Sequence, residues 1–406
     1  MHTLTVLYSR AMSLLSRLIM KFISVPAPLV YAGAGSSSAL MQAIGNFGHQ
    51  RVLVVTDKML VELGLVKQVT ASLAEQGIDT VIYDGVLPDP DFGQVNAGIA
   101  SCKQNRCDAV LAIGGGSALD AAKVIAICSG SDQEPANIVG YFNVKSRGLP
   151  IYCVPTTAGT GSEATMVSVV TDAQAETKCF IVDPKLVPDA VALDADLMLK
   201  LPAPITAATG MDALTHAIES ALSREASEDT LRKSLAAARI IFQNLESAVA
   251  DGGNRSAREA MALASYYAGS AFTIANVGYV HGMAHQLGAL CHLPHGLANA
   301  LFLPHVLDFY RDTCAPQMAR ISKSAGIGSA NDSDDILAEK LVERVKELSQ
   351  AIGIPTHADV LKPDQVATIA ARAMKESHGL YGYPVPKYMR GEECEAIVRK
   401  ILPVGE

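Results

Sequence analysis

Five of the chain's ten histidines lie in one stretch, residues 278–305. His281 and His285 are four positions apart, so on a helix they point to the same face. His295 stands between a proline and a glycine, which predicts a helix break that can turn its imidazole back toward that face. Because imidazole is the commonest metal ligand in proteins, this stretch is the first candidate for a functional site.

A second pair of potential ligands lies upstream, where Asp212 and His216 are also four positions apart. One carboxylate with two or three imidazoles suits a divalent first-row metal such as iron, zinc or manganese. A single histidine of this kind more often packs or hydrogen-bonds in a core than binds a metal. Two such pairs together with His295 predict a metal site.

A glycine-rich turn, Gly114-Gly115-Gly116-Ser117, follows an apolar run at 108–113 that predicts a buried strand. Glycines let the backbone approach a ligand closely, and the N–H groups of a following helix attract a phosphate. The turn is therefore a candidate for dinucleotide binding, although it lacks the GxGxxG pattern. The alternative is an ordinary tight turn between a strand and a helix.

A second turn, residues 155–162, follows the strand expected at 151–154. It offers flexible backbone and the hydroxyls of Thr156, Thr157 and Thr160, which could contact the same ligand. The alternative is an ordinary polar loop.

Asp57 ends the strand expected at 51–55. A carboxylate at the end of such a strand can accept hydrogen bonds from ribose hydroxyls. The alternative is that Asp57 caps the helix expected to begin at Lys58.

These residues need a scaffold, and residues 28–195 predict one of alternating strands and helices. Apolar runs predict strands at 29–32, 51–55, 78–83, 108–113 and 151–154. Segments with helical spacing lie between them, and short strands near 167–171, 178–182 and 190–193 complete the pattern. Such alternation predicts a mostly parallel sheet.

After Asp196 the pattern changes to alanine-rich segments with helical spacing. Turn residues predict helix breaks at 251–253, near 278, at 294 and at 304. We therefore expect an α/β domain over 1–195 and an all-helical domain over 196–406.

The first 24 residues contain no Asp or Glu, and the first acidic residue of the chain is Asp57. Leucines near helical spacing with interspersed arginines resemble a transit peptide or an interfacial helix. The apolar run is too interrupted to span a bilayer. We expect a helical extension docked on the protein or on a second copy of it, and no stable membrane insertion.

The composition describes a large globular protein of 406 residues, 49% of them hydrophobic. Its net charge of −8 argues against a nucleic-acid partner, which favours a basic surface. Eight scattered cysteines without a CxxC motif indicate a reduced, cytoplasmic protein without a disulfide framework.

Four segments, in order and well separated, resemble the iron-containing (group III) alcohol dehydrogenases. They are GGGSALDAAK (114–123), PTTAGTGSEAT (155–165), GMDALTHAIES (210–220) and HGMAHQLGALCHLPHGLANALFLPHV (281–306). The resemblance implies an α/β dinucleotide-binding domain followed by an all-α metal-binding domain, the architecture shared with dehydroquinate synthase. It also implies a homo-oligomer, commonly a dimer.

The resemblance assigns roles to individual residues. The expected metal ligands are Asp212, His216, His281 and His295, and His285 matches a catalytic residue near the metal that is not a ligand. The expected NAD-binding residues are Asp57, Asp89, Gly114, Gly115, Gly116, Ser117, Asp120, Thr156, Thr157, Thr160 and Lys178. Asp57 matches the acid that favours NAD over NADP.

The chain departs from the family pattern at two places. Many relatives have Asn where Asp89 stands between two prolines. The tail at 383–390 lacks the Asn-Pro-Arg often found there.

The resemblance implies a metal-dependent, NAD(H)-linked alcohol dehydrogenase that oxidises a small alcohol reversibly to an aldehyde or ketone by hydride transfer. Fe²⁺ is the expected metal, and Zn²⁺ also suits the ligands. The alternative from another class is a dehydroquinate-synthase-type lyase, whose acidic substrate needs several cations. Between Arg258 and Arg311 there is no Lys or Arg, which favours a weakly charged substrate.

Glycerol dehydrogenase and maleylacetate reductase are alternatives within the same superfamily. A third reading is a non-catalytic metal- or nucleotide-binding protein.

Overall fold

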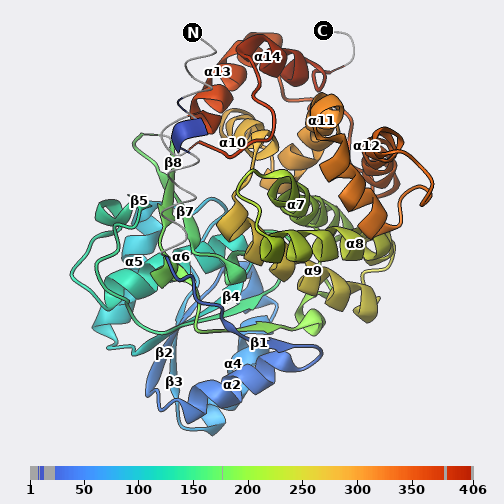
Figure 1. Ribbon diagram of the computed structural model, residues 1–406. Coiled ribbons are helices and arrows are strands. Elements are labelled where there is room, and N and C mark those ends of the chain that lie inside the picture. The colour runs from blue at the N-terminus through green and yellow to red at the C-terminus, as the bar shows by residue number, and fades with distance from the viewer. Residues whose placement is uncertain (1–7, 9, 13–22, 176, 379–381, 404–406) are drawn as a thin grey trace. The chain divides into compact units, whose positions relative to one another are not determined.

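The computed structural model describes residues 8, 10–12, 23–175, 177–378 and 382–403 (Figure 1). The chain forms two compact units, one of residues 24–200 and one of residues 201–406 together with 1–23. The sequence predicts the boundary between the α/β part and the helical part near residue 195.

The α/β unit is built on a six-stranded sheet in which every neighbouring pair is parallel. The strand order is β1-β9-β6-β4-β2-β3. Their bounds are β1 Leu29–Ala32, β2 Arg51–Val55, β3 Asp79–Tyr83, β4 Ala109–Gly114, β6 Ile151–Pro155 and β9 Ala190–Leu193. Strands β4, β6 and β9 are buried along their whole length, as expected for a parallel sheet covered on both faces.

Helices cover both faces of this sheet. One face, which includes Val52, Val54 and Leu111, packs against α2 (Ser36–Asn46) and α4 (Leu65–Glu75). The helices α5 (Phe92–Gln104) and α6 (Gly116–Ser129) lie on the opposite side (Figure 1). Connections between parallel strands are right-handed, so the direction in which the chain moves across the sheet decides which face its helices cover. This direction reverses between β3 and β4, and the helices after β3 therefore lie on the other face.

The remaining elements of this unit are short. Helix α3 (Lys58–Glu62) precedes α4, and a second sheet has the order β5-β8-β7. Its strands are β5 Gly140–Tyr141, β7 Val167–Asp172 and β8 Thr177–Val182, and β7 and β8 form an antiparallel pair. The 3-10 turns are η1 Pro135–Ile138, η2 Ser162–Ala164, η3 Pro184–Leu186 and η4 Ala195–Met198.

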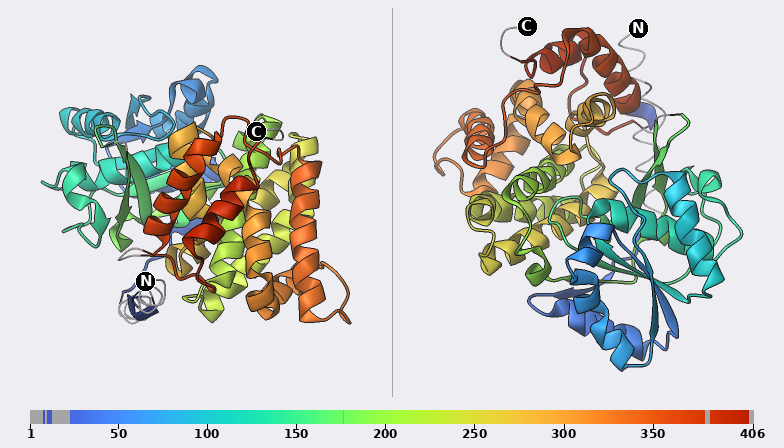
Figure 2. Two further views of the ribbon diagram at one scale, coloured as in Figure 1. Left: turned by 90° about the horizontal axis from the view of Figure 1, so that it is seen from above. Right: turned by 180° about the vertical axis from the view of Figure 1, so that it is seen from behind.

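Among its described residues, the second unit contains helices joined by loops and no strand. Its helices are α7 Ala203–Leu222, α8 Glu228–Ala250, α9 Arg255–Ala275, α10 Tyr279–Cys291, α11 His295–Ala325, α12 Asp334–Ala351, α13 Val366–Ser377 and α14 Gly391–Arg399, with the 3-10 turn η5 Pro363–Gln365. Helices α8 and α9 pack side by side, as do α11 and α12 (Figure 2). This fold class agrees with the prediction of an α/β unit followed by an all-α unit.

One predicted helix break is wrong. The sequence predicts a break at Pro304, but α11 continues through it. The non-helical backbone falls instead at Cys314, two residues before Pro316. A proline ring clashes with the preceding turn of its helix, which accounts for a kink just before Pro316.

Little of the N-terminal extension lies among the described residues. Tyr8 and residues 10–12 are helical, and the Arg10 guanidinium lies 5.8 Å from the centre of the Tyr388 ring. Residues 23 and 24 are not helical, and the remaining positions of the predicted docked helix lie outside the described residues. Within the described part of the chain, no helix combines the length and the apolar character needed to cross a membrane.

Candidate metal centre and cofactor-binding turns

Helix α7 carries Asp212 and His216 on one face, and Glu219 lies one turn further along that face. All three side chains are buried. The start of the helix is held by the buried Arg258, whose guanidinium donates to the Leu201 carbonyl at 3.0 Å and to the Thr206 hydroxyl at 2.6 Å. Arg258 therefore anchors the start of the helix that carries the two candidate ligands.

The other two candidate ligands come from separate helices. His281 lies in the first turn of α10, which begins after Gly278. Helix α10 ends at His292, which adopts the left-handed conformation with φ 53°, and α11 starts at His295 after Pro294. The predicted break before His295 is thus present, and it turns the chain so that His295 and His281 lie close together.

Four residues meet in one cluster: Asp212, His216, His281 and His295. Their ligand atoms all lie within 4.8 Å of one another. The Nε2 atoms of His216 and His281 are 2.9 Å apart, and Asp212 Oδ1 lies 3.4 Å from His295 Nε2. His295 is the most exposed of the four, with 29% of its side chain accessible, so its side of the cluster is the open one.

The chemistry of the cluster fits a divalent metal. Burial, together with the neighbouring His216, holds the pKa of His281 well below its ordinary value, so the imidazole is neutral. Burial opposes ionisation of Asp212, but the surrounding imidazoles outweigh it and lower its pKa. Neutral imidazole and ionised carboxylate are the forms that bind metals, so this set of donor atoms fits a divalent cation.

Three residues that the sequence does not single out support this cluster. The first is Asn299, one helical turn after His295 on α11. Its amide nitrogen donates to Asp212 Oδ1 at 2.7 Å and lies 3.2 Å from Nε2 of both His281 and His295. Asn299 lies four positions after His295, and this helical spacing is the one signal in the sequence that could have identified it.

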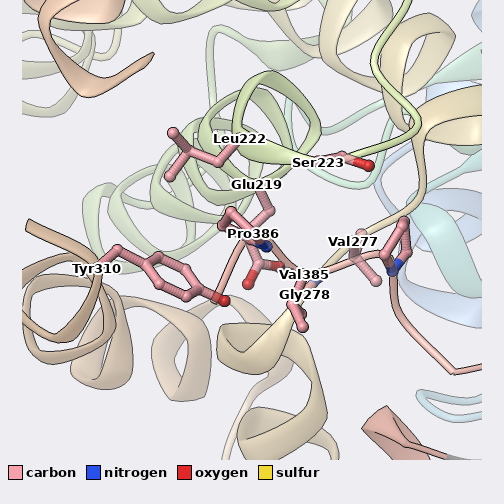
Figure 3. A pocket seen from close by; sticks show the side chains of 9 residues that line it. Glu219, Leu222, Ser223, Val277, Gly278, Tyr310, Val385 and Pro386 are labelled. Carbon is pink, nitrogen blue, oxygen red and sulfur yellow. Dashed lines mark hydrogen bonds between the residues drawn. The ribbon is translucent and has the colours of Figure 1, made fainter. Parts of the chain in front are cut away.

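The second is Glu219, whose Oε2 lies 2.7 Å from His281 Nδ1. The same carboxylate accepts the backbone N–H groups of Gly278 at 2.8 Å and Val280 at 2.7 Å. Burial raises the pKa of Glu219 to about 7, and the two backbone donors act in the opposite direction. Glu219 also lines a small pocket beside Tyr310 and the tail residues Pro384–Pro386 (Figure 3).

The third is Glu376 on α13, which holds His285. His285 Nδ1 lies 2.7 Å from Glu376 Oε1, and Gln286 and Tyr383 donate to the same carboxylate. The His285 ring stacks on His295 with centroids 5.3 Å apart, yet His285 is not one of the four clustered residues. This place beside the cluster fits the expectation of a nearby residue that is not a ligand.

The glycine-rich turn lies at the carboxyl end of β4, beside the turn that follows β6. The N–H of Thr156 donates to the Gly114 carbonyl at 2.9 Å. A Cβ on Gly116 would stand 2.5 Å from Thr160, whereas one on Gly115 would stand 3.5 Å from Thr157. Two of the predicted cofactor turns are therefore in contact at the edge of a parallel sheet where ligands bind in such folds.

The turn also leaves the start of α6 open to a ligand. Gly115 is the residue before the helix, and no side chain caps the N–H groups there. Ser117 lies in the first turn of the same helix. Uncapped N–H groups at a helix start attract phosphate.

Asp57 serves as a helix cap, and one of its oxygens also faces the glycine turn. Its Oδ1 accepts the N–H of Leu60 at 3.0 Å at the start of α3. Its Oδ2 lies 4.0 Å from the position that a Cβ on Gly114 would take. The two alternatives from the sequence are thus compatible, one for each oxygen.

Asp89 and Lys178 form an ion pair, with Lys178 Nζ 2.8 Å from Asp89 Oδ1. Asp89 has φ 54°, a left-handed conformation that Asn and Asp tolerate better than other side chains. The left-handed backbone at this position is therefore compatible with Asp.

Asp120 faces the second turn rather than open space. Its two oxygens accept from the Ser162 hydroxyl at 2.5 Å and from the Val169 N–H at 3.0 Å. One turn later, the buried Lys123 donates to the Thr165 carbonyl and hydroxyl and to the Val167 carbonyl. This part of α6 therefore fastens the second turn, a role that the motif alone did not reveal for Lys123.

Comparison with known proteins places the chain in a family. The family model for iron-containing alcohol dehydrogenase matches residues 27–195, and the model for the C-terminal part of the Fe-containing alcohol dehydrogenase family matches residues 206–402. The long-chain-alcohol dehydrogenase 1 of Geobacillus thermodenitrificans is 38% identical over 331 residues, covering 81% of this chain and 83% of the relative.

Two solved structures agree with these matches. A 1,3-propanediol oxidoreductase has a TM-score of 0.90 at 37% identity, covering 93% of this chain and 99% of that one. A sulfoacetaldehyde reductase from Bifidobacterium kashiwanohense, solved in complex with NAD⁺, has a TM-score of 0.84 at 27% identity, covering 94% and 99%. The chain belongs to the iron-containing alcohol dehydrogenase family, and it is an oxidoreductase that uses NAD and a divalent metal.

Proposed function

We propose that the protein oxidises a small, weakly charged alcohol reversibly to an aldehyde or ketone with NAD, using a divalent metal held by Asp212, His216, His281 and His295. The observation that carries the proposal is the convergence of these four ligand atoms within 4.8 Å, three of them on buried residues. Fe²⁺ is the metal we expect, and Zn²⁺ suits the same ligands.

The chemistry divides between the bound groups and the chain's own residues. When bound, the metal supplies Lewis acidity and NAD supplies the hydride acceptor. His285, held through Nδ1 by Glu376, is placed to accept the proton that the alcohol hydroxyl loses. Its stacking on His295 keeps this base next to the open side of the cluster.

We place the cofactor at the carboxyl edge of the parallel sheet. Gly114, Gly115, Gly116 and Ser117 form the turn and the uncapped helix start that we assign to the pyrophosphate, and Thr156, Thr157 and Thr160 line the neighbouring turn. Asp57 is assigned to the ribose hydroxyls. The Asp89–Lys178 pair is assigned to the cofactor as well, while Asp120 acts by holding the second turn.

The proposed substrate class is supported by the charge of the segment that carries two of the candidate ligands. Between Arg258 and Arg311 the chain has no Lys or Arg, and this stretch includes α10 and the first half of α11. A phosphorylated or strongly acidic substrate would find few cations there. This supports an alcohol or aldehyde over the acidic substrate of a dehydroquinate-synthase-type lyase.

We also propose that the protein is a cytoplasmic homodimer. The eight cysteines are all free thiols, and six of them are buried. This usage fits a reducing compartment. Dimerisation rests on the family resemblance alone.

A matched pair of variants tests the proposed function. His281→Ala should lose tight metal binding and nearly all turnover while remaining folded, because it removes one of the four ligands. His292→Ala is the control, since His292 is an exposed residue outside the cluster. Metal content is measured on both proteins, and NADH absorbance is followed with a panel of alcohols, aldehydes and phosphorylated acids. A His281→Ala protein with stoichiometric metal and the wild-type rate would disprove the assignment.

A further inference from the structure

Glu219 makes three hydrogen bonds to one short segment of the chain. Its Oε2 accepts the Gly278 N–H at 2.8 Å and lies 2.7 Å from His281 Nδ1, while its Oε1 accepts the Val280 N–H at 2.7 Å. Glu219 is 5% exposed, and His281 is 2% exposed. One buried carboxylate thus contacts both a candidate metal ligand and the backbone at the start of the helix that carries it.

The contact with Nδ1 determines which nitrogen of His281 is available for a metal. The two backbone N–H donors favour the ionised carboxylate, which can only accept, and this arrangement places the ring proton of His281 on Nδ1. The Nε2 lone pair then faces His216 Nε2, 2.9 Å away inside the cluster. A carboxylate that holds the second nitrogen of a ligand in this way fixes the ring orientation and raises the basicity of the ligating nitrogen.

The two backbone contacts cap helix α10. The first N–H groups of a helix have no partner within the helix, and a negative charge there is favourable. Gly278 suits this arrangement because a Cβ at that position would stand 2.7 Å from Glu219 Oε1. The close approach therefore requires a residue without a side chain.

The turn before α10 has an unusual backbone conformation, and it is held by residues of helix α7. Asn276 has φ 66° and ψ −177°, a conformation that is adopted almost only by glycine. Ser223, the residue that ends α7, donates to the Ala275 carbonyl at 2.5 Å. Helix α7 thus fastens this turn through two side chains, of which Glu219 alone also touches the ligand His281.

We propose that Glu219 is a positioning residue for the metal: it presents His281 Nε2 to the ion and couples that ligand to the start of α10. The inference rests on the proposed metal assignment of the four clustered residues. Coupling of this kind works in both directions, so metal binding should also protect the Asn276–Val280 turn against local opening.

The test uses the full-length protein, stripped of metal and titrated with Zn²⁺ against a chromophoric chelator. Glu219→Gln should weaken Zn²⁺ affinity by about 10- to 100-fold, the usual effect of removing the carboxylate behind a ligating histidine. Ser223→Ala is the matched control, because it loosens the same turn without touching His281. It should change the affinity by less than about threefold, an effect below 1 kcal/mol on the scale of 1.4 kcal/mol per tenfold.

Two further readouts separate positioning from simple destabilisation. Long-range ¹H–¹⁵N spectra of the histidine-labelled, Zn²⁺-loaded wild type should show His281 protonated at Nδ1, and Glu219→Gln should alter that signal. If Glu219→Gln does not fold, Gly278→Ala takes its place, since its Cβ displaces the carboxylate without removing the charge. It should weaken Zn²⁺ affinity in the same direction.

Three outcomes would overturn the inference. Wild-type Zn²⁺ affinity in a folded Glu219→Gln protein would show that the carboxylate is not needed for metal binding. The same result in Gly278→Ala would show this if Glu219→Gln does not fold. An equal loss in Ser223→Ala shows that order of the turn, not contact with His281, sets the affinity. Undiminished Zn²⁺ binding by His281→Ala refutes the metal assignment itself, and the inference fails with it for that separate reason.

Discussion

Asp57 has two candidate roles, capping helix α3 and favouring NAD over NADP. The two roles can be tested separately, because its two carboxylate oxygens have different surroundings. Oδ1 accepts the Leu60 N–H at 3.0 Å, and Oδ2 faces the glycine turn near Gly114. Asp57→Asn keeps an acceptor for the cap and removes the charge. Asp57→Ala removes both.

The expected magnitudes differ for the two roles. Loss of an N-cap acceptor costs about 0.5–2 kcal/mol of stability. One negative charge close to the 2′-phosphate of NADP costs about 1–4 kcal/mol at roughly 4 Å, for effective dielectric constants between about 80 and 20. At about 1.4 kcal/mol per tenfold, this corresponds to about fivefold to several-hundredfold preference for NAD.

The assay compares kcat/KM for NAD and for NADP in the wild type and both variants, alongside urea unfolding of each. The wild type should prefer NAD, and Asp57→Asn should reduce the preference mainly by improving the use of NADP, because it removes a repulsive charge. Only Asp57→Ala should also lose about 0.5–2 kcal/mol of stability. A wild type that prefers NADP, or an unchanged cofactor ratio in Asp57→Asn, would refute the ribose assignment and leave the cap as the sole role.

Two further predictions concern the α/β unit. Gly116→Ala should lower the free energy of unfolding by about 1–3 kcal/mol, since its Cβ would stand 2.5 Å from Thr160. Gly115→Ala should leave stability unchanged and weaken NADH binding, measured by fluorescence titration; equal destabilisation of both variants would contradict this difference. Burial raises the pKa of Glu163 to about 7, so the folded protein holds a proton that the unfolded chain has lost, and stability falls as pH rises from about 4.5 through 7. Urea unfolding at pH 5 and pH 8 measures this decline in the free energy of unfolding. Glu163→Gln should reduce the decline by on the order of 3 kcal/mol. An identical dependence on pH in both proteins would contradict burial of Glu163 as the cause.

The parts of the site that depend on local spacing could be read from the sequence. Asp212 and His216 share a helix face, and Pro294 forces the break that returns His295 to the cluster. The strands of the sheet are apolar runs, so their order along the chain was also accessible. The fold class was predicted for the same reason.

The residues that support the site could not be found in this way. Glu219, Asn299 and Glu376 look like ordinary polar residues of amphipathic helices, and only tertiary packing brings them to a histidine. The sequence shows Lys123 only as the last residue of the segment 114–123, and nothing in it predicts that this lysine is buried and makes three hydrogen bonds. Local propensity also failed at Pro304, where the packed helix α11 continues despite the proline.

The division of the cluster among α7, α10 and α11 has a consequence for assembly. His216 and His281 are 65 positions apart, so an ion held by both closes a long loop of the chain. If the four clustered residues hold the metal as proposed, a tight site requires that these three helices have docked, so we expect metal to bind late in folding. Free metal at a thousandfold excess over its Kd adds about 4 kcal/mol to the stability of the loaded form. We therefore expect removal of the metal to lower the stability of the helical unit as well as to stop turnover.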